Sequence, residues 1–436
     1  MSARTGKTLG AALAALLLIA AAAPEGRLAQ YQRLRAEAAA ATRAGDLAGA
    51  ETRLEAALAL YPASPGTLLR LARVEGAAGK PDEALARLRT YADLGMAGDL
   101  AQDPALKPLT LLPGFAPVAA RLTANAAPKG EPFEVIQPGK AGDIWEGVAA
   151  VDDGWLISSV TARAIVQTTE DGSLKPFFEP DAETGGLFGM AVDRRGGALW
   201  VAEASGPGIP GSGSPRRTGL LKLSLSDGRV LARYPAPDDG KPHQLGDVTV
   251  APDGTVYASD SVGAALYRLK PGGAALEAFV TSTEMASPQG MVVCPGGGVL
   301  VVADYTTGLH RIDLKTGADT LVGGTDGVAL AGTDGLSPLP RKGGGVWLLA
   351  TQNGVAPQRV LALRLSRDCR TLQGAEVLAS GGTDLDDLSL GAAGGSGGVV
   401  IGSSGWAGYD GEGRPLTPTP RAARLLFIPL PLRSSP

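Results

Sequence analysis

The chain has 436 residues, of which 62 are glycine and 32 are proline, and a formal net charge of −4. This content of glycine and proline is typical of turn-rich β structure and argues against a mainly helical protein. Lysine and arginine are not concentrated in one stretch, so the composition does not predict a nucleic-acid-binding surface.

The amino terminus has the pattern of an export signal. Arg4 and Lys7 precede an uncharged Ala/Leu segment at residues 9–23, and a basic start before an apolar segment of about 7–15 residues is typical of secretory signals. We predict that residues 1–24 are a signal peptide or an amino-terminal anchor of a periplasmic or secreted protein. If the segment is not cleaved, it would attach the protein to the inner membrane. A cytosolic protein with a leading helix is the alternative.

Residues 27–126 are predicted to form a helical module. The pattern RAGDLAGAETRLEAALAL returns as GAAGKPDEALARLRT. The equivalent positions, each 34 residues apart, are Gly45 and Gly79, Ala50 and Ala84, and Leu54 and Leu88. This period, with Gly between helices and Ala where they pack, resembles the tetratricopeptide repeat, which implies a surface for a protein partner. A rigid spacer is the alternative. Since about three repeats make a free-standing array, we expect this shorter module to pack on the propeller or on a partner.

Residues 131–432 contain six copies of one β unit. Each copy has a short apolar strand, a turn and an alternating strand, as in LGDVTVAPDGTVYASD at residues 245–260. The second residues of the copies, at intervals of 42, 58, 43, 45 and 52, are Gly147, Gly189, Asp247, Gly290, Gly335 and Asp387. A period of about 40–50 residues with several strands per unit predicts a β-propeller. The predicted fold class is therefore mostly β, a six-bladed β-propeller after an α-helical module.

The last repeat is one strand short. It ends with ARLLFIPL at residues 423–430, whereas FEVIQ at residues 133–137 precedes the first repeat as a lone strand. Pairing the two segments in one blade would close the ring and remove two exposed sheet edges. We predict that pairing.

The first residues of the six innermost strands are expected to meet at one mouth of the central channel. They are Glu146, Phe188, Gly246, Gln289, Asp334 and Asp386, with Asp247 and Asp387 beside two of them. Carboxylates about 4 Å apart repel by about 4 kcal/mol at an effective dielectric of about 20. A cation, a shared proton or intervening water must relieve that repulsion. Oxygen ligands without His or Cys favour Ca²⁺, with Mg²⁺ or Mn²⁺ as alternatives.

These motifs resemble the gluconolactonase/senescence-marker-protein family of six-bladed, metal-dependent lactonases. The resemblance implies three metal ligands: Glu146 in WEG, Gln289 in PQGMVV, where the family has Asn, and Asp334 in TDGLS. It further implies that Gly246 and Asp247 in LGDVTV, which replace an Asn-Asp pair, face the substrate.

The aromatic residues near the mouth are predicted to form an apolar lip. They are Phe188, Trp145 and Trp406, and Phe188 would contact the substrate. Packing between blades is the alternative for all three.

The favoured function is that of an exported hydrolase acting on a small lactone or related ester. The ion would polarise the carbonyl and lower the pKa of a bound water, and Asp334 or His243 would be the general base. A solvated loop position is the alternative for His243. The competing function is a non-catalytic binding or scaffold protein that docks a partner through the propeller and the helical repeats.

Five further residues have a predicted structural role or a role that stays open. His310 alternates with apolar residues on a third strand and is predicted to be a surface residue, and Asp260 and Asp304 are predicted to bond backbone amides in turns. Cys294 and Cys369 are the only cysteines, which excludes a CxxC redox motif and a thiolate zinc site. Their spacing does not show whether they pair.

Overall fold

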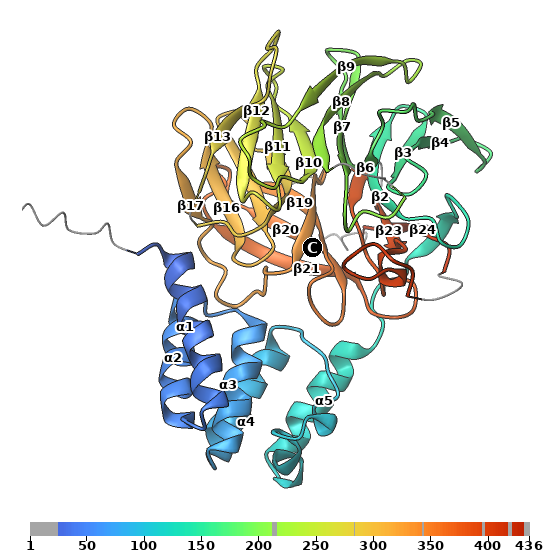
Figure 1. The fold of residues 1–436 in the computed structure, drawn as a ribbon. Coiled ribbons are helices and arrows are strands. Elements are labelled where there is room, and N and C mark those ends of the chain that lie inside the picture. The colour runs from blue at the N-terminus through green and yellow to red at the C-terminus, as the bar shows by residue number, and fades with distance from the viewer. Residues whose placement is uncertain are drawn as a thin grey trace, which may run out of the picture.

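The computed structural model describes residues 25–211, 216–282, 284–341, 344–394, 397–416 and 421–430. Figure 1 shows helices from the amino-terminal part beside a ring of sheets. The predicted export segment, residues 1–24, lies outside the described residues. Within the described part, no helix is long and apolar enough to cross a membrane.

Six four-stranded antiparallel sheets form the ring in the described part of the chain, which confirms the predicted propeller (Figure 1). Blade one contains β2 (Trp145–Val151), β3 (Gly154–Ser159), β4 (Ile165–Thr168) and β5 (Leu174–Phe178). Blade two contains β6 (Gly186–Asp193), β7 (Ala198–Ser205), β8 (Arg217–Ser224) and β9 (Val230–Pro235). Blade three contains β10 (Leu245–Val250), β11 (Val256–Asp260), β12 (Ala265–Leu269) and β13 (Glu277–Val280). Blade four contains β14 (Pro288–Val293), β15 (Val299–Asp304), β16 (Gly308–Asp313) and β17 (Asp319–Leu321). Blade five contains β18 (Thr333–Pro338), β19 (Val346–Gln352), β20 (Arg359–Leu365) and β21 (Leu372–Ser380).

Blade six joins the two ends of the propeller. It contains β22 (Gly391–Gly394), β23 (Gly397–Ser403), β24 (Arg424–Pro429) and, on its outer edge, β1 (Phe133–Ile136). Phe133 pairs with Phe427 across β1 and β24, with ring centroids 5.2 Å apart. The predicted closure is confirmed, and β24 is paired on both sides rather than left as an exposed edge.

The hydrophobic core is divided among the spaces between neighbouring blades. Leu156 of blade one packs with Leu187 and Leu199 of blade two, and all three side chains are fully buried. Alternation along each strand sends apolar side chains to both sheet faces, because both faces are covered by other blades. The tight turn after β10 needs a positive φ, which Gly254 adopts at +86°.

A disulfide between Cys294 and Cys369 joins blades four and five. Cys294 lies in the turn between β14 and β15, and Cys369 lies in the turn between β20 and β21. Both residues are buried. The bond closes a loop across 75 positions of the sequence, so it constrains the unfolded chain over a long distance.

The helical module has the predicted repeat geometry. Its elements are α1 (Arg27–Arg43), α2 (Leu47–Leu60), α3 (Pro65–Ala77), α4 (Pro81–Asp93), the 3₁₀ turns η1 (Leu100–Gln102) and η2 (Lys107–Leu111), and α5 (Phe115–Ala126). Gly45 and Gly79 end α1 and α3 with φ of +78° and +75°, which an L side chain rarely adopts. Ala50 and Ala84 are fully buried, as close packing of antiparallel helices requires.

The module packs on the propeller, as expected for so short an array. Arg359 at the start of β20 is 4% exposed. Its guanidinium donates to the carbonyls of Leu94, at 3.1 Å, and Ala329, also at 3.1 Å, and to Gln352 Oε1 at 2.5 Å. Ala329 itself belongs to the apolar cluster of the module. The interface thus contains a buried arginine that bonds neutral oxygen atoms from both parts.

Replacing Arg359 by Met should destabilise the protein by about 2–4 kcal/mol. The substitution keeps an apolar stem but leaves buried oxygen acceptors without donors. An acceptor that is buried and unpaired has lost its hydrogen bonds to water without replacement, which lowers the free energy of unfolding. Urea denaturation of the full chain measures the effect, with Arg367→Met as the control because Arg367 is exposed. Equal midpoints for the two variants would contradict this role of Arg359.

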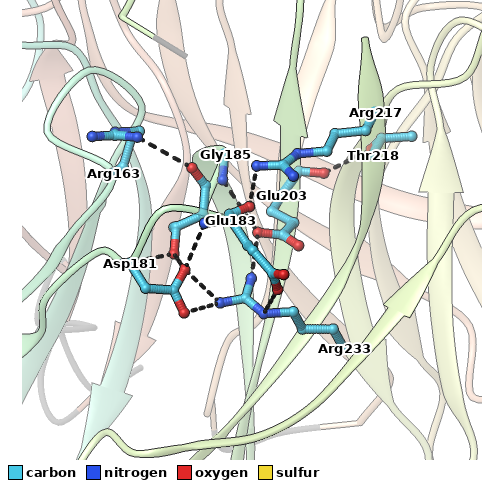
Figure 2. Close-up of polar contacts among 9 residues, drawn as sticks. Arg163, Asp181, Glu183, Gly185, Glu203, Arg217, Thr218 and Arg233 are labelled. Carbon is cyan, nitrogen blue, oxygen red and sulfur yellow. Dashed lines mark hydrogen bonds and ion pairs between the residues drawn. The ribbon is translucent and has the colours of Figure 1, made fainter. Parts of the chain in front are cut away.

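A cluster of charged side chains contacts the segment between β5 and β6 (Figure 2). Arg233 of β9 pairs with Asp181, at 2.7 Å, and with Glu203 of β7, at 3.4 Å. Glu203 also accepts from the backbone N–H of Gly185, at 3.4 Å. Gly185 immediately precedes β6, so the cluster contacts the start of this inner strand.

Candidate functional site

The first residues of the inner strands surround a cavity of about 150 Å³ at one mouth of the channel. It is lined by Glu146, Phe188, Gln244, Gly246, Asp247, Ser261, Gln289, Gly290, Asp334, Leu390 and Trp406. The structure therefore brings together every residue predicted for the metal and the substrate. Sequence separations of well over one hundred residues are bridged by the radial arrangement of the blades.

The innermost strand of the sixth repeat begins later in the sequence than predicted. Leu390, not Asp386, lines the cavity, because β22 begins at Gly391. Asp386 is exposed and pairs with Arg421 instead. Asp387 accepts backbone N–H bonds from Gly405, at 2.8 Å, and Ala407, at 3.1 Å, so it fixes the loop on which Trp406 lies.

Three carboxyl groups face this cavity and none of its lining residues is basic. Each is partly buried. Burial, together with the charge of Asp334, raises the pKa of Glu146 and the pKa of Asp247, each to about 8. Burial also raises the pKa of Asp334, against the hydrogen bond from Asn353. Acids kept near each other without a counter-charge are typical of sites that bind a cation or transfer protons.

Neighbouring side chains hold the three predicted ligands. Trp406 Nε1 donates to Glu146 Oε2 at 2.5 Å, and Asn353 Nδ2 donates to Asp334 Oδ2 at 2.7 Å. Gln289 Nε2 donates to Ser287 Oγ at 2.9 Å. Gln289 Oε1 lies 3.8 Å from where a β-carbon of Gly246 would stand, so the missing side chain leaves space beside the amide oxygen.

The donor set fits a hard divalent cation in charge and atom type, since it consists of carboxylate and amide oxygens. The carboxylates at the mouth lie farther apart than those of one acidic group in the helical module. Among the described residues, only Glu51, Glu55 and Glu75 gather three acidic ligand atoms within 4.8 Å, and Lys80 and Arg87 pair with that group. An ion at the mouth would therefore have few protein ligands and several positions open to water or substrate.

One side of the cavity is apolar. Phe188 and Trp406 stack with ring centroids 6.4 Å apart, which agrees with the predicted lip. Trp145 does not line the cavity and packs between blades six and one. Gly189 must lack a side chain, because a β-carbon there would lie 2.2 Å from Asp247 Oδ1.

The structure does not bring His243 to the cavity, and the solvated loop position predicted as its alternative is wrong. The residue is 8% exposed. Its Nδ1 lies 2.6 Å from Asp260 Oδ2 and its Nε2 lies 2.9 Å from Asp239 Oδ1. Both contacts require an N–H, so the imidazole has no free nitrogen with which to accept a proton.

The pKa of His243 should lie above 6.5. Burial lowers it, but hydrogen bonds and charge from Asp239 and Asp260 outweigh burial and raise the pKa of His243. Its contribution to stability should be complete below the unfolded pKa of about 6.5 and lost as pH rises through the folded pKa. Proton NMR titration measures this, because the chain has 2 histidines and His243→Gln identifies the signal. A value below 6.5 would contradict the two-carboxylate clamp.

His310 is fully buried, so its predicted surface position is wrong. Its Nδ1 lies 2.8 Å from Asp319 and its Nε2 lies 2.7 Å from Thr307. The predicted turn-bonding role of the two strand-end aspartates is confirmed: Asp260 accepts from the backbone N–H groups of residues 244 and 263, and Asp304 from those of residues 286, 287, 306 and 307.

Sequence reasoning did not identify Asn353 or the bond from Trp406 to Glu146. Asn353 directly follows the second strand of its repeat, close to where Asp260 and Asp304 end theirs, so aligning the repeats would have drawn attention to it. No repeat pattern marks the loop of Trp406, which is 260 residues from its partner.

Fold and site together define a six-bladed propeller with an oxygen-lined cavity at one mouth, preceded by a helical repeat module. Residues 41–95 match the family model for the tetratricopeptide repeat. No curated protein matches the chain.

Several solved structures are similar to the chain. A gluconolactonase from Xanthomonas campestris has 17% identity and a TM-score of 0.44 over 69% of this chain and 90% of that chain. The calcium-binding protein regucalcin from Agrobacterium tumefaciens has 13% identity and a TM-score of 0.47 over 69% and 93%. Virginiamycin B lyase from Staphylococcus aureus has 12% identity and a TM-score of 0.43 over 70% and 100%. Identities this low say nothing about a shared activity.

Proposed function

We propose that the protein is a divalent-metal-dependent hydrolase of small lactones or related esters, with Ca²⁺ as the first candidate ion and Mg²⁺ or Mn²⁺ as alternatives. The observation that supports this is the cavity itself. It combines three carboxyl groups and an amide oxygen, no basic side chain, and an aromatic side formed by Phe188 and Trp406.

Glu146, Gln289 and Asp334 would hold the ion, which when bound would polarise the carbonyl and lower the pKa of a coordinated water. Phe188 and Trp406 would pack on the apolar part of the substrate and exclude solvent. Asp247 lines the same cavity, has no assigned ligand role, and keeps a high pKa through burial. Where it is deprotonated, at and above pH 8, it can accept a proton, whereas both ring nitrogens of His243 are already bonded.

We place this activity outside the cytoplasm, in the periplasm or as a secreted protein. The disulfide between Cys294 and Cys369 supports the proposal, because such bonds persist in oxidising compartments and are rare in reducing ones.

Calorimetric titration of the full chain with Ca²⁺ at pH 8 tests the proposal. Wild type should release or absorb heat with one site at the mouth, and Asp334→Asn should weaken binding at least about 100-fold, since it removes a charge from a small ligand set. Asp386→Asn is the matched control, because Asp386 is exposed and off the cavity. Equal binding by both variants, or none by wild type, would rule out the metal site. Where Ca²⁺ binds, a panel of lactones and esters measures hydrolysis.

A non-catalytic docking protein is the second candidate, and the repeat match at residues 41–95 is what favours it. Leu111, the last residue of η2, is 87% exposed and could contribute to a protein contact. This function predicts no binding of Ca²⁺ and no hydrolysis.

A further inference from the structure

Asn353 makes three hydrogen bonds at the rim of the cavity. It follows β19, and its Nδ2 donates to Asp334 Oδ2 at 2.7 Å and to the carbonyl of Leu388 at 3.0 Å. Its Oδ1 accepts from the hydroxyl of Tyr305 at 3.0 Å. The side chain thereby connects blade five to Tyr305, which follows β15 within blade four, and to the segment that leads into blade six.

These partners determine which way the amide of Asn353 points. The carboxylate of Asp334 and the carbonyl of Leu388 both accept hydrogen bonds, so they require the NH₂ group. The reversed amide would place its oxygen against two acceptors, and only the tyrosine hydroxyl suits either orientation. Asn353 is therefore held in one orientation by its surroundings, before any ligand binds.

The carboxyl group of Asp334 has two oxygens, and the structure uses them differently. Oδ2 is bonded to Asn353, whereas Oδ1 has no hydrogen-bond partner within the described residues. Asp334 is partly buried and lines the cavity. A carboxyl group held through one oxygen cannot rotate freely. Its other oxygen, Oδ1, is therefore available to bind an ion in the cavity.

We propose that Asn353, with its amide oriented by the Leu388 carbonyl and held by Tyr305, is a positioning residue that makes Asp334 a ligand through one oxygen. The proposal rests on the proposed metal site. Residues that hydrogen-bond a metal ligand and orient it typically change metal affinity by about 10–100-fold when they are replaced. Asn353 touches neither the ion nor the substrate in this scheme and acts only through Asp334.

The test uses Tb³⁺ as a luminescent substitute for Ca²⁺ on the full chain. Trp406 lines the cavity and bonds Glu146, so its indole can transfer excitation to a bound lanthanide. Decay rates in H₂O and D₂O count the waters on the ion. Asn353→Leu, which is similar in size but cannot donate, should weaken Tb³⁺ binding about 10–100-fold and raise the count by about one water as Asp334 leaves.

Tyr305→Phe is the second variant, because it removes one hydroxyl from a ring that is 37% exposed and should fold even if Asn353→Leu does not. It should weaken binding in the same direction by about 2–10-fold, since the amide of Asn353 loses only one of its bonds. Affinity and water count equal to those of wild type in both variants would overturn the positioning role alone. Absence of Tb³⁺ binding by wild type would overturn the metal site and this inference together.

Discussion

Replacing Asp247 by Asn should stabilise the protein at pH 8 when divalent ions are removed with EDTA. Burial, followed by the charge of Asp334, raises the pKa of Asp247 to about 8. The folded state therefore binds a proton that the unfolded state has released. Between the two pKa values, the free energy of unfolding of wild type falls as pH rises, by up to about 1.4 kcal/mol per pH unit. Asn keeps the oxygen that accepts from the N–H of Val248 at 2.8 Å.

The advantage of Asp247→Asn should thus increase by about 3 kcal/mol from pH 5 to pH 8, measured by urea denaturation. Asp253→Asn is the matched control, because Asp253 is exposed on the same blade and its bond to the N–H of Thr255 also involves one oxygen. A difference in stability between the variant and wild type that does not change with pH would contradict a raised pKa of Asp247 in the folded state. Gain of stability on removing a charge is typical of functional sites.

The double variant Cys294→Ala, Cys369→Ala should lose about 4 kcal/mol of stability. The disulfide closes a loop across 75 positions, and in the chain-entropy model such a loop lowers the entropy of the unfolded state by an amount worth about 4 kcal/mol. Since Cys294 and Cys369 are the only cysteines, no second disulfide joins these two turns. Reductant should shift the urea midpoint of wild type toward that of the double variant.

The double variant itself supplies the control, because reductant should not change its midpoint. Both cysteines are at most 3% exposed, so part of any loss in the single variants reflects altered packing, which the double variant shares. An unchanged midpoint for wild type in reductant, at a concentration shown to release both thiols, would contradict a stabilising bond.

Most of the architecture follows from local sequence patterns. Each blade is an antiparallel meander of neighbouring segments, so strand alternation and turn glycines were enough to count six blades and to pair residues 133–137 with the last one. The helical repeat followed from a short period for the same reason. Cavity residues such as Glu146 and Asp334 were identified because strand entry, and so position at the mouth, is part of the repeat pattern.

The sixth repeat shows where the local sequence pattern no longer predicts which residues line the cavity. Its segment GAAGGSGG has few side chains that could set the pairing of an inner strand. Packing against the neighbouring blades therefore decided that Leu390, and not the predicted Asp386, lines the cavity. The burial of His310 was decided in the same way, because alternation predicts a face of the sheet but not what covers that face.

By itself, the sequence determined the kind of fold, the number of blades and the set of acids and amides brought to one mouth. Only the tertiary structure decided the hydrogen bonds that orient them: Trp406 with Glu146 across 260 residues, and Asn353 between Tyr305 and Asp334. The reason is physical. A strand's periodicity specifies which side chains face inward, whereas a hydrogen bond depends on distances and angles set only when the ring closes and the blades pack.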